Sequence, residues 1–162
     1  MLLRSYPRPF QETDWQEVLS LNLRQADKDE LMASVGLTPA EAIFFSIVDS
    51  TENWVVIHDG KIEAVFGVRW VPEHNVAVPW FLGTDKIIEY SIAFLRQSKK
   101  VVDAWLDQYG ILLNLVDSRH TASIKWLRWL GFTVDEEVKV HLFDPNVPFY
   151  LFFKVKEADA RV

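Results

Sequence analysis

Residues 120–132, HTASIKWLRWLGF, constrain the fold of this 162-residue chain more than any other stretch. Three apolar residues repeat there at the spacing of one helix face: Ile124, Leu127 and Leu130. Lys125 and Arg128 fall on the other faces. Gly131 can take the left-handed conformation that ends a helix without a Cβ penalty. The pattern therefore predicts an amphipathic helix that ends at Gly131.

A predicted strand lies on each side of this helix. Residues 111–116, ILLNLV, form an apolar run of strand length, and Phe132 opens a second strand with the sequence TVDEEVKVHLF. Asp117 or Ser118 is placed to cap the helix between them. The order strand, capped helix, glycine, strand predicts a compact β-α-β-like unit.

The first half of the chain predicts a strand, helices and a hairpin. A short strand is expected at 2–6, with Pro7 and Pro9 breaking its regularity. Helices are expected over 13–23 after a cap at Thr13-Asp14, after Asp27 as far as Gly36, and from Thr38-Pro39 onward. Residues 54–71 read as a hairpin whose Asp59-Gly60 turn is the strongest local turn signal.

The second half adds a strand at 75–83, a helical period within 86–109 and a late aromatic strand, FYLFFKV, expected in the core. No internal repeat or linker interrupts the chain. We expect one α/β (α+β) domain over 1–162, a mixed central sheet flanked by helices. Its element order is roughly β-α-α-β-β-β-α-β-α-β.

Composition limits the classes of function. Hydrophobic residues make up 49% of the chain and aromatic residues 14%, as in a packed globular protein. The net charge of −6 argues against DNA binding as the main activity, because phosphate contacts need a basic surface. Four histidines without cysteine or His-x-x-His spacing predict no metal site. A soluble protein is expected, without a membrane-spanning segment.

The 120–132 stretch resembles motif B of the GNAT superfamily, the acyl-CoA-dependent N-acyltransferases. The family pattern is roughly Asn-x-x-(Ala/Ser)-Ile-x-x-(Tyr/Leu)-x-x-x-Gly-Phe. Four positions match it: Ser123, Ile124, Gly131 and Phe132. His120 stands where the asparagine usually is, and Leu127 where a tyrosine often is. The alternative is an ordinary amphipathic helix before a strand.

The GNAT resemblance implies a cleft for acetyl-CoA. The residues placed there by the resemblance are Phe81, Leu82, Gly83, Ser91, Ile92, Ala93, His120 and Ser123. The family's phosphate loop is rich in glycine, which lets the backbone approach the pyrophosphate. The corresponding segment here, residues 84–93, contains no glycine, and Asp85 and Glu89 add negative charge. The sequence therefore leaves two alternatives open: acetyl-CoA as the cofactor, or no cofactor.

The sequence offers no residue that is clearly placed for proton transfer. Many GNAT enzymes use a motif B tyrosine to protonate the thiolate, which Leu127 cannot do, and Tyr90 and Tyr109 are unplaced alternatives. Possible bases are Glu63, Glu73 and His74, although solvated surface positions explain these three more simply. For His120, helix capping is favoured over ligand contact.

Residues 80–135 also resemble the small internal virion (core) proteins of short-tailed phages, which look GNAT-derived and lack the glycine-rich loop. This resemblance implies a fold kept for protein interaction, in the virion or in the host cytoplasm. The alternative is an active N-acetyltransferase with an atypical CoA loop. A fainter alternative is an RNA- or ribosome-associated module that uses Trp126, Trp129 and the nearby basic residues, although core packing explains at least one of these tryptophans.

Overall fold

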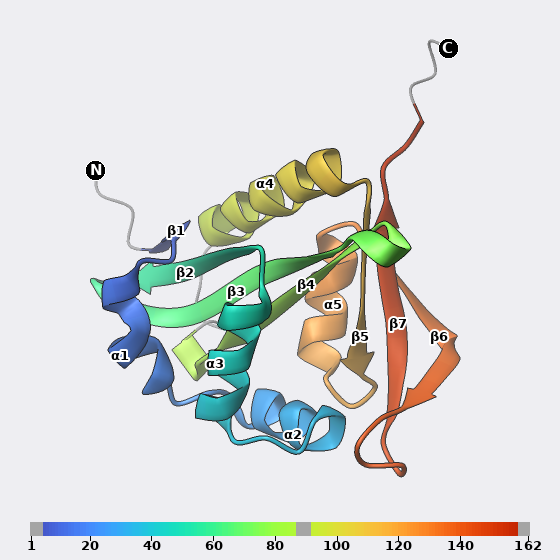
Figure 1. Cartoon of the computed structure of the whole chain (residues 1–162), viewed down its shortest axis with the longest axis horizontal. Coiled ribbons are helices and arrows are strands. Elements are labelled where there is room, and N and C mark those ends of the chain that lie inside the picture. Colours follow the sequence, from blue (N-terminus) through green and yellow to red (C-terminus); the bar gives the residue numbers. More distant parts are fainter. Residues whose placement is uncertain (1–4, 87–91, 159–162) are drawn as a thin grey trace.

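The computed structural model describes residues 5–86 and 92–158, with side chains described except at 92–94. Its centre is a mixed seven-stranded sheet with the order β1-β2-β3-β4-β5-β7-β6 (Figure 1). The strands are β1 Ser5–Pro9, β2 Glu52–His58, β3 Lys61–Val71, β4 Val76–Gly83, β5 Ile111–Asp117, β6 Thr133–His141 and β7 Pro148–Val155. Strands β4 and β5 pair in parallel, and every other neighbouring pair is antiparallel.

Helices cover both faces of this sheet. They are α1 Trp15–Leu19, α2 Gln25–Ser34, α3 Pro39–Asp49, α4 Ile92–Tyr109 and α5 Thr121–Trp129, with 3₁₀ turns at Glu12–Asp14 and Pro72–His74. Helices α4 and α5 pack on one face through a core that includes Trp105 and Leu127. Helices α1 and α3 pack on the other face around Val18 and Ile43. The expected mixed sheet with flanking helices is confirmed. The described elements include one helix and one strand more than the rough order above, although the segments expected one by one contain them all.

The sequence of β3 explains how the sheet has two buried faces. Along this strand Ala64, Phe66 and Val68 face α4 and α5, whereas Val65 faces α1 and α3. Ile62 also faces α1 and α3, because the register with β2 shifts between Ile62 and Ala64. Alternate residues point to opposite faces, so a strand covered on both sides needs a continuous apolar run. This is the reason for the apolar run AVFGV, residues 64–68, at the centre of the sheet.

Local signals fixed several element ends as predicted. Asp59 and Gly60 both have positive φ (48° and 80°), the conformation of a tight hairpin turn. Thr38 and Glu41 form a reciprocal capping box at the start of α3. Gly131 has φ 95°, and the Phe132 N–H bonds the Leu127 carbonyl across it. This is the Schellman arrangement that ends α5.

Three expectations at the element ends were wrong. Pro7 and Pro9 do not break the first strand, because β1 is an edge strand, where a missing N–H is tolerated. The first α-helix ends at Leu19 instead of continuing to residue 23. The cap of α5 is His120, not Asp117 or Ser118, because the Asp117 carboxylate is occupied by Arg119.

No single described helix is long and apolar enough to cross a membrane. Helices α2 and α3 reach the required length and composition only as a pair, and that pair is bent by 70°.

Candidate functional site

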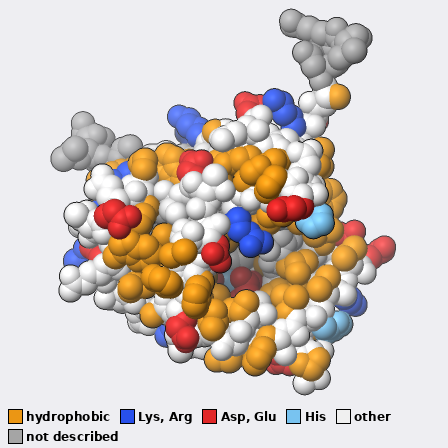
Figure 2. All heavy atoms as spheres, in the orientation of Figure 1, with side chains coloured by type: hydrophobic (Ala, Val, Ile, Leu, Met, Phe, Trp, Pro, Cys, Tyr) orange, Lys and Arg blue, Asp and Glu red, His pale blue; other side chains and the backbone are white. Residues whose placement is uncertain are grey.

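The candidate site is a cavity of about 550 Å³ where β4 and β5 separate. The two strands share one bridge, between Ala77 and Leu112, and have no further paired residues toward their carboxyl ends. Side chains from both faces of the sheet line the cavity, including Leu31 and Phe45 on one face and Trp105 and Trp126 on the other. The cavity therefore passes through the sheet. In Figure 2 the face formed by α2 and α3 is hollowed near its centre.

The outer edge of β4 forms one wall of this gap. Alternate residues direct their backbone groups to the same side, so Ala77, Pro79, Phe81 and Gly83 face β5. The Pro79 carbonyl accepts a hydrogen bond from Asn114 Nδ2 across the gap, at 2.8 Å. This side-chain bond replaces the missing strand pairing at that point.

At its carboxyl end, the edge of β4 is occupied by the chain itself. The Gly83 N–H donates to Asp27 Oδ2 at 2.9 Å, and the Gly83 carbonyl accepts from the Arg24 N–H at 2.9 Å. Leu23 and Thr84 form an antiparallel bridge beside them. The segment that leads into α2 thus acts as a short strand against β4, and it leaves Phe81 as the last residue whose edge groups face the gap.

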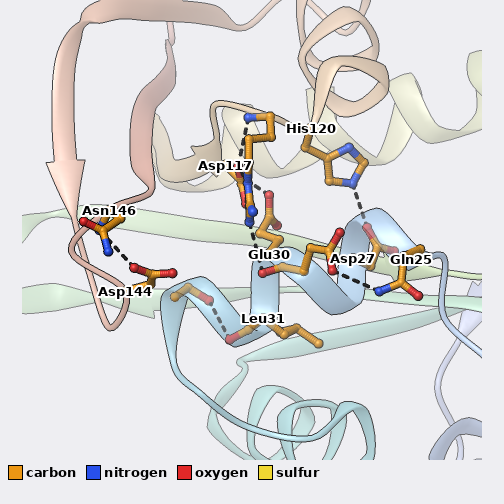
Figure 3. Close-up of polar contacts among 11 residues, drawn as sticks. Gln25, Asp27, Glu30, Leu31, Asp117, His120, Asp144 and Asn146 are labelled. Atoms are coloured by element: carbon orange, nitrogen blue, oxygen red, sulfur yellow. Dashed lines mark hydrogen bonds and ion pairs between the residues drawn. The ribbon is translucent and has the colours of Figure 1, made fainter.

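A buried ionic cluster holds this segment in place. Asp27 Oδ1 accepts from Arg24 Nη2 at 2.8 Å. It also accepts from His120 Nε2 at 2.8 Å (Figure 3). Asp27 and His120 are almost fully buried, and Arg24 nearly so. Burial opposes the charge of Asp27, but hydrogen bonds from His120 and Arg24 outweigh it and lower the pKa of the carboxyl. One carboxylate therefore links α2, the end of β4 and the start of α5.

His120 belongs to this cluster and caps α5. Its Nδ1 accepts the N-cap hydrogen bond from the Ser123 N–H at 3.4 Å, so we assign the proton to Nε2, which donates to Asp27. The Ser123 hydroxyl lies 3.1 Å from Nε2 and lines the cavity. The expected capping role of His120 is confirmed.

Glu30 lies one turn further along α2 and lines the cavity. Its Oε2 accepts a hydrogen bond from the Asp117 N–H at 3.0 Å, and Asp117 in turn pairs with Arg119 (Figure 3). Burial, together with the nearby carboxylates of Asp27 and Asp117, raises the pKa of Glu30 to about 7, against the opposing effect of the Asp117 hydrogen bond. Glu30 is thus a carboxyl group that changes protonation near neutral pH.

The structure brings together only part of the predicted cleft. Phe81, Leu82 and Ser123 line the cavity. Gly83 is not among the lining residues, and its edge groups are already paired. Ser91 lies outside the described residues. Ile92 and Ala93 begin α4, and their side chains are likewise outside the description.

The predicted acids and bases lie elsewhere. Glu63 accepts a hydrogen bond from the Thr84 hydroxyl at 2.6 Å, in a different surface depression. Glu73 and His74 are exposed in the turn between β3 and β4. Tyr109 stacks on Trp70, where burial raises its pKa. Tyr90 is outside the described residues.

Sequence reasoning missed Arg24, Asp27 and Glu30. Their only signal is a spacing of three, which places them on one helix face. Such a charged row usually indicates a solvated face. Within the described ranges, no group of three His, Asp or Glu side chains is arranged to hold a metal ion.

Several solved structures with a similar fold are N-acetyltransferases. No protein-family model and no curated protein matches the sequence. A GCN5-related N-acetyltransferase from Kribbella flavida superposes with a TM-score of 0.67 at 17% identity, over 94% of this chain and 98% of that one. The ribosomal-protein-S5-alanine acetyltransferase from Vibrio fischeri gives 0.69 at 13% identity, over 97% and 96%.

A third similar structure contains a ligand. A ribosomal L7/L12 α-N-protein acetyltransferase in complex with coenzyme A superposes with a TM-score of 0.67 at 11% identity, over 98% of this chain and 97% of that one. The sequence identities are low, so the likeness concerns the fold alone. The chain has the GNAT N-acetyltransferase fold.

Proposed function

We propose that this chain is a GNAT-fold binding protein that does not turn over acyl-CoA and acts through contact with another protein. The observation that carries this proposal is the occupied edge of β4, where Arg24 and Asp27 take both backbone groups of Gly83. The GNAT resemblance implies that an acyl-CoA arm would need backbone groups of this strand. A buried ionic cluster stabilises the occupied state, so a ligand would have to displace it.

The segment after β4 supports the same conclusion. Residues 84–93 contain no glycine, whereas Asp85 and Glu89 add negative charge where the GNAT resemblance would place a pyrophosphate. The resemblance of residues 80–135 to internal virion proteins of short-tailed phages favours a role in a phage particle or in its host. In that setting the fold would supply a shape and a contact surface.

The contact surface that we propose is the apolar face of α2 and α3. Large exposed hydrophobic side chains there, and on the β6–β7 loop beside it, are Met32, Val35, Phe44, Phe45, Val48, Leu142 and Phe143. Figure 2 shows hydrophobic groups gathered around the hollow on this side. The rings of Phe44 and Phe45 lie 5.5 Å apart, and Val35, Phe45 and Leu142 share the wall of the cavity. Exposed apolar patches of this kind mark protein contacts.

The two tryptophans of α5, Trp126 and Trp129, do not form a second exposed surface of equal size. Trp126 packs against the core and Phe81, whereas Trp129 is 46% exposed. The expectation that core packing accounts for at least one of them is confirmed. The RNA-binding alternative then depends on Trp129 with Lys125 and Arg128 alone.

A photo-crosslinking amino acid placed at Phe45, in cells that naturally express the protein, tests the proposed surface. The matched control is the same probe at Lys125, an exposed residue of α5. We expect the probe at position 45 to capture one partner protein that the probe at position 125 does not capture. That partner, once purified, should bind the wild-type chain and not the Phe45→Asp variant. Equal capture at both positions, or unchanged binding of the variant, would contradict the proposed surface.

An acyltransferase is the second candidate, and the cavity itself favours it. The cavity passes between β4 and β5, the Phe81 edge groups face it, and burial raises the pKa of Glu30 to about 7, a range that suits a general base. Titration with acetyl-CoA separates the two candidates.

A further inference from the structure

An exposed row of side chains on α3 places an aromatic ring between two carboxylates. Glu41, Phe45 and Asp49 follow one another at intervals of four residues, so they lie one turn apart on the same face of the helix. All three are exposed, and Phe45 has 49% of its surface accessible. A central ring of the proposed contact surface is therefore flanked on each side by an acidic group.

The Asp49 carboxylate makes no contact that would stabilise the fold. Within residues 5–86 and 92–158 it forms no hydrogen bond or ion pair, although Arg69 lines the same cavity. Asp49 is the last residue of α3, whose last turn contains no basic residue. A negative charge at the carboxyl end of a helix costs about 0.3–1 kcal/mol. A cation from outside the chain would offset this cost.

The Glu41 carboxylate is also available to a cation. Its Oε1 accepts hydrogen bonds from the N–H and the hydroxyl of Thr38, and these bonds lower the pKa of Glu41. The group is therefore ionised at neutral pH. Both bonds use Oε1, which leaves Oε2 on the exposed side chain for a partner.

The elements around this row carry little positive charge. Helix α3 and the β6–β7 loop, residues 142–147, contain no lysine or arginine, and the loop adds Asp144. Helix α2 contains three acidic residues and one basic residue, Lys28, which donates to Asn22. A second copy of the chain, with its own net charge of −6, would bring carboxylates against carboxylates. The charges therefore favour a basic partner over a second copy.

We propose that the partner of the contact surface is a protein with a basic amphipathic segment. In it, a large apolar side chain packs on Phe45 between two lysine or arginine residues that pair with Glu41 and Asp49. This assignment rests on the proposed function, because it names the partner of the same surface. Positions 41 and 49 lie about 12 Å apart along the helix axis. The two cations are then about eight residues apart in a helical partner, or about four apart in an extended one.

Selection from a display library of random peptides tests this chemistry. The wild-type chain is the target and the Phe45→Asp variant is used for counter-selection, so the retained peptides depend on the contact surface. We expect them to carry a large apolar residue with lysine or arginine on both sides, in excess over the unselected library. Retained peptides that are enriched in acidic residues or show no charge bias would overturn the proposal, as would a selection that retains none.

Asp49→Asn removes the charge and keeps the size of the side chain. The affinity of a selected peptide should fall roughly two- to fivefold, as for an exposed ion pair, and the difference should shrink at high salt. The matched control is Asp107→Asn, exposed on α4 across the sheet, which should leave the affinity unchanged. Equal affinity of wild type and Asp49→Asn would overturn the proposal.

Two further outcomes keep this inference separate from the proposed function. A partner captured at position 45 in cells whose binding segment is acidic or uncharged would support the proposed function and overturn the basic partner. Sedimentation of the purified chain tests the remaining occupant. A dimer that Phe45→Asp dissociates would assign the surface to a second copy and overturn the proposal, whereas a monomer supports it. Binding of acetyl-CoA would overturn the proposed function, whereas the peptides decide the chemistry of the surface.

Discussion

At the scale of single residues, Glu30 is the group whose environment differs most from its ordinary one. It is held in the cavity wall by the Asp117 N–H, and its pKa is raised to about 7, mainly by burial. The unfolded chain loses this proton near pH 4.3. Between these values the folded state binds more protons than the unfolded state, so stability falls as pH rises.

Glu30→Gln should remove the fall in stability at high pH, because glutamine does not ionise. Its side-chain oxygen can still accept the hydrogen bond from the Asp117 N–H. We expect the variant to be close to wild type near pH 4.5 and to exceed it by up to about 4 kcal/mol at pH 8, since each pKa unit corresponds to about 1.4 kcal/mol. Urea unfolding at several pH values measures the difference. Glu73→Gln, at an exposed position, is the control. A difference between Glu30→Gln and wild type that does not change with pH would contradict the assignment.

At the scale of elements, Asp27 links three of them with one carboxylate. It bonds Arg24 beside it, Gly83 at the end of β4 and His120 at the start of α5. Because β4 and β5 pair at only one bridge, this link and the Asn114–Pro79 bond hold the two halves of the sheet together near the gap.

Asp27→Ala should therefore destabilise the fold strongly. It leaves Arg24 and His120 buried without their partner, and the loss of one member of a buried ion pair costs about 3–5 kcal/mol. Asp29→Ala, two residues along the same helix but exposed, should stay within about 0.5 kcal/mol of wild type. Urea unfolding of both variants measures the effect. An Asp27→Ala variant within 1 kcal/mol of wild type would show that the cluster is not a structural link.

The sequence was sufficient to predict those elements whose ends are determined by residues close to them in the chain. The helix before Gly131, the turn at Asp59-Gly60 and the cap at Thr38 each depend on neighbours within a few residues. Edge position and ion pairing depend on partners far along the chain, as for Pro7 in β1 or for Asp27 and His120, which lie 93 residues apart. For this reason the sequence predicted the fold and part of the cavity wall, but not the cluster that closes the edge of β4.

At the scale of the whole molecule, the chain has an acetyltransferase fold, whereas the function that we propose for it is contact with another protein. The fold of sheet and helices superposes on N-acetyltransferase structures. In our proposal, the occupied edge of β4 and the glycine-free segment after it disfavour acyl-CoA binding, because the chain's own residues fill part of the place where the GNAT resemblance puts the cofactor.

Calorimetric titration of acetyl-CoA into the full chain tests this account most directly, with an active N-acetyltransferase in the same buffer as the positive control. We predict no binding heat and no rise in melting temperature at millimolar acetyl-CoA. A ligand present at a hundred times its Kd would add about 2.7 kcal/mol to the stability, which is easily measured. Binding with a micromolar Kd would contradict the account and favour an acyltransferase.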